Sequence, residues 1–175
     1  MAAEMDFEGV VAAYYESLYK FAFSLSREEA DACDLTQQTF YVWATKGHQI
    51  RDVTKVKTWL FTTLHRQFLE SRRRRTRFPQ QNLESAEIEL PLLSPETAST
   101  LDADQVLHSL AQVDDVYQAP VALFYLEGCA YKEIAEILEV PLGTVKSRIA
   151  RGIGQLQEIL ATDIAAGGGR KTKPL

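Results

Sequence analysis

The chain has 175 residues, which is enough for one ordinary domain or two small ones. Its composition, 46% hydrophobic and 25% charged, is that of an average globular protein. It has no apolar run long enough to span a bilayer and no signal-peptide pattern, so a membrane-embedded or exported class is not expected. The two cysteines, Cys33 and Cys129, form no CxxC pair, which argues against a disulfide framework or a thiolate metal site and favours a reducing cytoplasm.

The formal net charge of −5 hides an uneven distribution along the chain. Residues 51–78 carry nine basic and two acidic side chains, whereas residues 79–105 carry six acidic and no basic ones. Residues 140–175 are again basic, with six basic against two acidic side chains. Because salt screens charges over about 10 Å, the local patch matters more than the total. The sequence therefore predicts two basic surfaces on an acidic chain.

The first elements in chain order are three amphipathic helices. Apolar residues recur at spacings of three and four from Phe7 to Leu25. A second helix is expected from about Glu29 to Lys46, with Gly47 as its stop. The third begins at Val56, shows the clearest period, and continues through a run of arginines before Pro79.

A change in composition separates these helices from the rest. Residues 79–100 contain three prolines, several Ser and Thr, acidic residues and few apolar positions. This pattern predicts a flexible acidic linker between a domain at 1–78 and a second at 101–161. The glycine-rich, basic residues 162–175 are expected to be a disordered tail.

The second domain is also expected to be helical. A helix starts near Leu101, and Pro120 is expected in the first turn of the next one, with Val121, Phe124 and Tyr125 facing inward. A short helix over Tyr131–Leu138, a turn over Glu139–Leu142 and a last helix from Gly143–Thr144 follow. No strand alternation extends beyond a few residues, so the predicted fold class is all-α.

The stretch Tyr131–Arg151 has the features of a helix-turn-helix. Ala135 is the small residue that lets two helices cross closely, and Val145 is the apolar residue early in the second helix. The second helix then exposes a basic and hydroxyl face, which suits the major groove because arginine grips guanine edges and lysine or serine holds phosphate. The alternative is a helix pair with a charged outer face, which the joint occurrence of these features disfavours. The exposed face consists of Lys146, Ser147, Arg148 and Arg151.

These segments resemble a known family. EIAEILEVPLGTVKSRIARGIGQL resembles region 4 of the extracytoplasmic-function sigma factors of bacterial RNA polymerase. DACDLTQQTFYVWATKG and KTWLFTTLHRQFLESRRRR resemble region 2 of the same class, so the resemblance covers roughly residues 7–77 and 102–160. It implies a sigma factor that directs promoter-specific transcription initiation, catalyses no reaction and needs no cofactor.

The resemblance also implies partners. They are promoter DNA and the core RNA polymerase, through the clamp helices of its largest subunit and its flap region. The sequence leaves open whether control comes from an anti-sigma factor or from phosphorylation. In region 4, the resemblance assigns the −35 element to Thr144, Lys146, Ser147, Arg148 and Arg151.

In region 2, the resemblance implies docking on the polymerase through Asp34, Gln37, Gln38 and Trp43. Core packing is the alternative reading for Trp43. The segment Gly47–Lys55 matches the loop that captures a flipped base of the −10 element. A basic groove suits the phosphates of the melted −10 strand, whereas a solvated helix end is the alternative for the arginine run. The strand-binding residues implied are Lys57, Arg66, Arg72, Arg73, Arg74 and Arg75.

Several positions depart from the family pattern. Arg66 stands where asparagine is common, Gln38 where an acid is common, and Glu139 where glycine is frequent. Gly152 and Gly154 each cost a helix about 1 kcal/mol, so the distal recognition helix is expected to fray.

A further hypothesis concerns phosphorylation beside Gln38, the position on the docking helix where an acid is common. Phosphorylation of Thr39, or of nearby Thr36, would add about −1.5 to −2 charge units there and strengthen docking; threonines that are never modified are the alternative.

Three other functions were weighed. A regulator of the response-regulator output type also ends in a GTVKSR-like helix, but it would carry an α/β domain ahead of it. An enzyme is disfavoured because His48, His65 and His108 show no metal spacing and no nucleophile or phosphate-loop motif is present. A helical protein that only binds partner proteins remains, and binding to RNA polymerase would distinguish the sigma factor from it.

Overall fold

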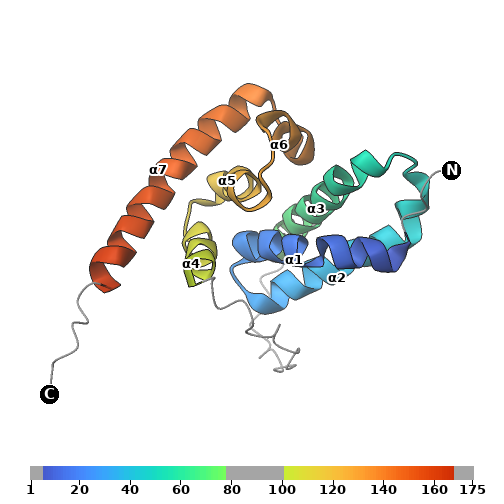
Figure 1. Ribbon diagram of the computed structural model, residues 1–175, viewed down its shortest axis with the longest axis horizontal. Helices are drawn as coiled ribbons and strands as arrows, with labels where there is room; N and C mark the ends of the chain where they lie inside the picture. Colours follow the sequence, from blue (N-terminus) through green and yellow to red (C-terminus); the bar gives the residue numbers. More distant parts are fainter. Residues whose placement is uncertain (1–5, 78–100, 168–175) are drawn as a thin grey trace, which may run out of the picture.

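The computed structural model describes residues 6–77 and 101–167, and every regular element in these two ranges is helical (Figure 1). The all-α fold class expected from the sequence is therefore confirmed. The expected linker at 79–100 lies outside the described residues, as does the end of the expected tail. The elements are α1 Phe7–Ser26, α2 Glu29–Lys46, η1 Gly47–Gln49, η2 Val53–Lys55, α3 Val56–Arg77, α4 Leu101–Leu110, α5 Asp115–Glu127, α6 Tyr131–Leu138 and α7 Leu142–Gly167.

Helix α1 begins and ends with defined caps. Asp6 accepts a hydrogen bond from the N–H of Gly9 at 3.0 Å, which satisfies one of the unpaired donors of the first turn. The helix ends at Arg27, which adopts the left-handed conformation (φ 65°) and donates its N–H to the carbonyl of Phe23. The apolar side of α1 packs on α2 and α3, where the rings of Phe21 and Phe61 are 5.4 Å apart. The three helices thus share a core.

The end of α2 depends on a close contact rather than on a left-handed glycine. Gly47 has φ −59°, a right-handed conformation that any residue adopts. A Cβ at this position would lie 2.6 Å from Cδ2 of Trp43, so only glycine leaves room for the indole ring. Trp43 is 7% exposed and packs edge-on against Trp59, with ring centroids 5.4 Å apart. Core packing, the alternative reading of Trp43, is the observed one.

Helix α5 corrects two expectations about Pro120 and Tyr125. Pro120 lies inside α5 rather than in its first turn, and it is buried. A proline has no N–H to donate, so the carbonyl of Val116 loses its helical partner. Val116 itself is exposed, at 56%. Tyr125, expected to face inward, is 48% exposed, while Val121 is buried as expected.

Helix α7 is continuous to Gly167, beyond the expected end of the second domain at residue 161. Gly152 has a packing role, because a Cβ there would lie 2.3 Å from Cγ2 of Val121 on α5. Gly154 meets nothing within 4 Å. The side-chain amide of Gln155 also donates to Asp114, the N-cap of α5, at 2.7 Å. Close approach and this bond fix α7 on α5.

The two halves of the chain pack against each other. Helix α1 contacts α4 and α5, and α3 contacts α6, as Figure 1 shows. A single cluster of buried apolar residues runs through both halves; it includes Leu18, Leu60 and Leu64 from the first and Leu123, Ile134 and Ile149 from the second. The sequence predicts an apolar stripe on each helix but not which stripes meet, so this joint core was not anticipated.

Candidate nucleic-acid interface

The helix-turn-helix expected from the sequence is formed by α6 and α7. Helix α6 ends at Glu139, whose backbone is left-handed (φ 56°, ψ 44°) and whose N–H donates to the carbonyl of Ala135. The N–H of Val140 donates to the same carbonyl at 3.2 Å. These two bonds close the C-terminus of α6 and redirect the chain into α7 after a short turn.

The core determines which side of α7 faces outward. Val145 and Ile149, one helical turn apart, are almost fully buried, and Leu156 continues the same side. The positions between them therefore point away from the core. The five residues predicted to read DNA all lie on this helix: Lys146, Ser147 and Arg151 are exposed, and Thr144 and Arg148 are half-buried.

His65 on α3 lies near two charged side chains of the helix-turn-helix. This side chain is half-buried, and burial lowers its pKa from the ordinary 6.5 to about 4. Two charges of the helix-turn-helix act on it in opposite senses, since Glu139 raises the pKa and Arg148 lowers it. His65 is therefore neutral near pH 7. The charged groups that act on it are Glu139 and Arg148.

The face of α2 predicted to dock on the polymerase is exposed, with one exception. Asp34, Gln37 and Gln38 are exposed and lie within one turn of each other. Trp43 is buried against Trp59 and cannot offer its ring to a partner, so its assignment to this face is corrected. Tyr41, one turn beyond Gln37, is 70% exposed and extends this exposed face, although the sequence pattern was not used to place it there. Its position at the spacing of the docking face was the available signal.

The two threonines considered for phosphorylation are buried. Thr36 and Thr39 are both fully excluded from solvent. The hydroxyl of Thr39 donates to the carbonyl of Leu35 at 2.7 Å and lies 3.1 Å from Oε1 of Gln67 on α3. A phosphate at Thr39 would separate α2 from α3, so strengthening of the docking face by this modification is not supported.

The cations of α3 are largely engaged by acidic side chains. Three of the four arginines in the run from Arg72 to Arg75 pair at short distances: Arg72 with Asp115 at 2.8 Å, Arg74 with Glu70 at 2.8 Å and Arg75 with Asp31 at 2.7 Å. Arg73 makes no ion pair with any residue of the described ranges. Arg66 pairs with Glu139 of the helix-turn-helix.

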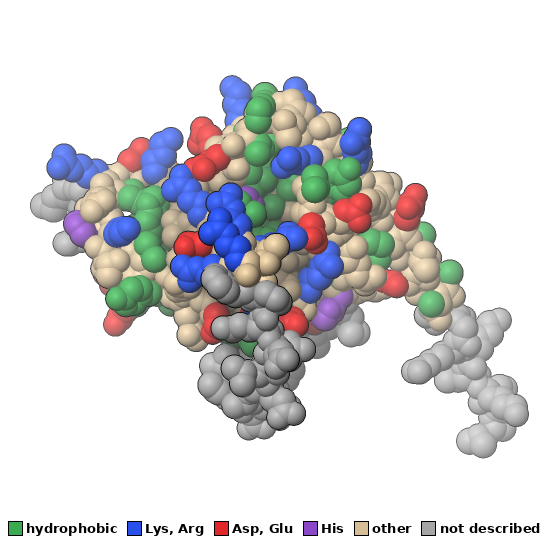
Figure 2. Space-filling view, turned by 180° about the vertical axis from the view of Figure 1, so that it is seen from behind, with side chains coloured by type: hydrophobic (Ala, Val, Ile, Leu, Met, Phe, Trp, Pro, Cys, Tyr) green, Lys and Arg blue, Asp and Glu red, His purple; other side chains and the backbone are tan. Residues whose placement is uncertain are grey.

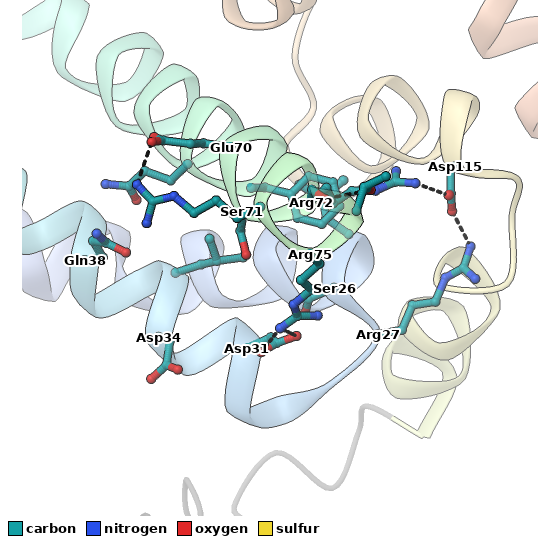
Figure 3. A pocket seen from close by; sticks show the side chains of 16 residues that line it. Ser26, Arg27, Asp31, Asp34, Gln38, Glu70, Ser71, Arg72, Arg75 and Asp115 are labelled. Atoms are coloured by element: carbon teal, nitrogen blue, oxygen red, sulfur yellow. Dashed lines mark hydrogen bonds and ion pairs between the residues drawn. The ribbon is translucent and has the colours of Figure 1, made fainter. Parts of the chain in front are cut away.

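Asp115, in the first turn of α5, joins both halves of the molecule. Its two carboxylate oxygens accept from Arg27 and Arg72, each at 2.8 Å (Figure 3). Arg27 also donates to the carbonyl of Val113 at 3.2 Å. These pairs border a groove of about 570 Å³ between α2, α3 and the start of α5, which Asp34 and Gln38 also line. The groove thus brings together residues assigned to polymerase docking and to strand binding.

Lys57, the remaining predicted strand-binding residue, is half-buried. Its Nζ donates to the backbone carbonyl of Glu127, at the end of α5, at 3.3 Å. Burial raises the pKa of the Glu127 carboxyl, and the positive charge of Lys57 opposes that rise. In Figure 2, basic side chains gather near the middle of the face shown, with acidic side chains beside them. Of the six residues predicted to bind the strand, Lys57, Arg66 and Arg72 contact groups of the second half of the chain.

Comparisons with known proteins agree with this geometry. The sequence profile of "Sigma-70 region 2" matches residues 10–78, and that of "Sigma-70, region 4" matches residues 103–156. The ECF RNA polymerase sigma factor SigE of Mycolicibacterium smegmatis is 33% identical over 165 residues, which cover 91% of this chain and 63% of SigE. SigM of Bacillus subtilis, also an ECF sigma factor, is 25% identical over 158 residues, covering 89% of this chain and 95% of SigM.

A solved sigma factor shares the arrangement of both halves. RpoE of Bartonella quintana, in complex with the anti-sigma factor NepR, matches with a TM-score of 0.73 at 30% identity, covering 91% of this chain and 99% of that one. CnrH, in complex with the cytosolic domain of CnrY, matches with a TM-score of 0.60 at 23% identity, which supports the fold alone. The chain belongs to the extracytoplasmic-function sigma factors.

In this sigma factor, helices α1 to α3 correspond to region 2 and helices α4 to α7 to region 4. The chain spans less than two thirds of SigE and nearly all of SigM. Within residues 6–77 and 101–167, no helix is long and apolar enough to cross a membrane. No group of three or more His, Cys, Asp or Glu in the same ranges is placed to hold a metal ion.

Proposed function

We propose that this sigma factor binds core RNA polymerase and directs it to specific promoters, with region 2 binding and melting the −10 element and the helix-turn-helix of region 4 reading the −35 element. One observation carries the proposal. The burial of Val145 and Ile149 turns a basic face of α7 outward, within the segment that matches sigma region 4. Binding and strand separation need no covalent step, so we assign no catalytic residue.

Region 4 is proposed to act through the first turns of α7. A recognition helix contacts base edges in the major groove with its N-terminal residues. Arg148 and Arg151 are the side chains long enough for bidentate contacts to guanine, while Lys146 and Ser147 suit phosphate oxygens. Ser147 donates to the carbonyl of Thr144 at 3.1 Å in the free chain, so it must exchange that bond for one to DNA.

Region 2 is proposed to carry two separate surfaces. The exposed face of α2 with Asp34, Gln37, Gln38 and Tyr41 docks on the clamp helices of the polymerase. An exposed aromatic beside polar residues is typical of a binding hot spot. The cations of α3 hold the phosphates of the melted −10 strand. They are Lys57, Arg66, Arg72, Arg73, Arg74 and Arg75.

An anti-sigma factor is included among the proposed partners. The support is the likeness to RpoE of Bartonella quintana, which was solved in complex with NepR. The similarity covers both regions of this chain, which are the parts a protein inhibitor of docking and DNA binding has to cover.

The recognition-helix assignment is tested by Arg148→Ala and Arg151→Ala. Each should weaken binding to a −35 duplex by about 1–3 kcal/mol and leave binding to core polymerase unchanged. Lys20→Ala, which removes a cation of α1 outside both proposed DNA surfaces, is the matched control and should change neither. Affinities are measured by fluorescence anisotropy with the labelled duplex and by pull-down of core polymerase.

The same titration distinguishes base contacts from phosphate contacts. Loss of a base contact relaxes specificity at one position, whereas loss of a phosphate contact lowers affinity uniformly and reduces the salt slope by about one. Unchanged duplex binding in both arginine variants would remove the recognition-helix assignment. A loss of polymerase binding in the same variants would place α7 in polymerase docking instead.

A further inference from the structure

Two polar contacts join α2 to α3 inside region 2. The buried hydroxyl of Thr39 on α2 bonds to Oε1 of Gln67 on α3 at 3.1 Å. Closer to the start of α2, Nη2 of Arg75 donates to both carboxylate oxygens of Asp31, at 2.8 and 2.7 Å (Figure 3). Within residues 6–77, these are the places where side chains of α2 and α3 hydrogen-bond to each other. Together they form two α2–α3 bridges.

The two bridges are equally spaced on the two helices. Asp31 and Thr39 are eight positions apart on α2, and Gln67 and Arg75 are eight positions apart on α3. With a rise of about 1.5 Å per residue, each helix advances roughly 12 Å between its bridging residues. Because the helices run in opposite directions and advance equally, neither can slide along the other without breaking both bridges.

The bridged stretches carry the two surfaces proposed for region 2. On α2, the stretch between the bridging residues contains the docking residues Asp34, Gln37 and Gln38. On α3, the corresponding stretch contains the strand-binding cations Arg72, Arg73 and Arg74. Docking and strand binding are therefore assigned to different helices, and the bridges fix one helix against the other.

Burial distinguishes the bridges from ordinary surface contacts. Thr39 is fully excluded from solvent. The side chain of Asp31 is 22% exposed, against 62% for Glu70, whose ion pair with Arg74 lies within α3. Water competes less for a partly buried pair, so its geometry is held more firmly. Asp31 uses the donors of one nitrogen of Arg75, and the other guanidinium N–H groups remain for a phosphate.

We propose that Asp31, Thr39, Gln67 and Arg75 are positioning residues, which hold the strand-binding helix in place relative to the polymerase once α2 has docked. The inference rests on the function proposed for α2 and α3. Docking fixes α2, and the polymerase fixes the path of the melted strand. A shift of α3 against α2 therefore moves the strand-binding cations away from their phosphates. Cations that are already in place bind without a further ordering cost.

The same reasoning separates the free chain from the assembled one. A short single strand can adjust its position to α3 when no polymerase constrains it. Loss of a bridge should therefore leave strand binding by the free chain unchanged. It should weaken strand binding only where α2 is held by polymerase.

A pair of threonine variants tests the buried bridge. Thr39→Val removes the hydroxyl that reaches Gln67. Thr36→Val is the matched control, because the hydroxyl of Thr36 is equally buried but bonds only to the carbonyl of Ala32, at 2.7 Å within α2. Both variants replace a buried threonine on the same helix, so the general cost of the substitution is similar in the two.

A pair of carboxylate variants tests the other bridge and avoids the core. Asp31→Ala removes the partner of Arg75, and Glu70→Ala, the matched control, removes the partner of Arg74 within α3. Each variant removes one negative charge and releases one arginine. A general electrostatic gain in DNA affinity is therefore the same in both.

Three affinities of the full-length chains are measured. They are the affinity for core polymerase, the affinity of the free chain for a single-stranded −10 oligonucleotide, and the affinity of the assembled polymerase for a promoter duplex with a pre-melted −10 region. Each bridge variant should weaken only the third, by about threefold to tenfold relative to its control, the range of one net hydrogen bond. The first two should equal those of the control, because each surface lies on a single helix.

The outcomes distinguish the inference from the function on which it rests. Equal binding of the pre-melted promoter by bridge and control variants would overturn the inference and leave the two proposed surfaces in place. Equal losses in all three affinities would show a general loss of structure instead of positioning, and would also overturn it. If the native chain does not increase binding of the pre-melted promoter over that of core polymerase alone, the proposed function itself is contradicted, and the inference with it.

Discussion

The two surfaces proposed to bind DNA differ in what occupies them. On α7 the cations Lys146 and Arg151 are exposed, and no acidic side chain within residues 6–77 pairs with them. On α3, Arg66 and Arg72 are bound to acids of region 4. Basic side chains are therefore exposed to solvent on α7, whereas basic side chains on α3 are paired with acidic side chains of region 4.

This difference shows that a run of basic residues in a sequence does not by itself predict a surface of unpaired basic side chains. The outward face of α7 follows from local helical spacing, because Val145 and Ile149 fix the inward one. The engagement of α3 depends on residues such as Asp115, which lies on another helix 43 positions from Arg72. Substitutions on α2, α3 and α7 test which side chains are buried or engaged and which are exposed.

The largest effect is expected where a residue assigned to a surface proves to be core. Trp43→Ala should lower the free energy of unfolding by about 3–5 kcal/mol, because it empties the space between Trp59 and Gly47. Tyr41→Ala, on the exposed side of the same helix, should change stability by less than about 0.5 kcal/mol. Urea unfolding followed by circular dichroism measures both.

The same pair tests the docking face. Tyr41→Ala should weaken binding to core polymerase by more than about 1 kcal/mol if it is an anchor of that face. The control is Lys46→Ala, which removes an exposed side chain near the end of α2 outside this face. Full polymerase binding by Tyr41→Ala would contradict its assignment.

The next effect concerns two glycines of α7: Gly152, which packs against α5, and Gly154, which has no neighbour within 4 Å of an added Cβ. Gly152→Ala should destabilise the chain by about 1–3 kcal/mol, because its Cβ would overlap Val121. Gly154→Ala meets open space and should stabilise α7 by about 1 kcal/mol through helix propensity alone. Opposite signs in urea unfolding are expected; equal signs would show that α7 does not approach α5 as described.

The smallest effect is the pH dependence contributed by His65. Burial lowers its pKa to about 4 in the folded chain, against the ordinary 6.5 in the unfolded one. Between these values the unfolded chain binds more protons, so the contribution to stability is present above pH 6.5 and is lost as the pH falls toward 4. At a half-buried site we expect an effect on the order of 1 kcal/mol.

His65→Gln isolates this contribution, because it removes the titrating group and keeps a polar side chain. The unfolding free energy of the native chain should fall more steeply from pH 7 to pH 5 than that of His65→Gln. Parallel pH profiles of the two chains would show that His65 is not buried between the regions.

Local features of the fold were predictable and distant ones were not. The bounds of α2 and α6 and the inward side of α7 agree with the expectations, because helical spacing and stop signals act within one element. Pro120 was expected in the first turn, but α5 already begins at Asp115, five residues earlier, without a side-chain cap that the sequence would show. The close approach at Gly152 depends on a neighbouring helix and was read as a weakness.

The residues of the candidate site also differ in how far the sequence predicts them. Lys146 and Arg151 are exposed where helical spacing placed them, whereas Trp43, predicted on the docking face of α2, is buried. The pairing of Arg66 with Glu139 joins positions 73 residues apart and has no local signal. Only the packing of region 4 on region 2 brings these two side chains together.

Run-off transcription with purified core RNA polymerase on a promoter library tests most directly the claim that this chain is a promoter-reading sigma factor. With the chain added, transcripts should start at a subset of templates that share a −35 and a −10 element, and core polymerase alone should show no such selection. The double variant Arg148→Ala with Arg151→Ala should lose dependence on the −35 element. Starts with the native chain that are no more selective than those of core polymerase alone would contradict the account.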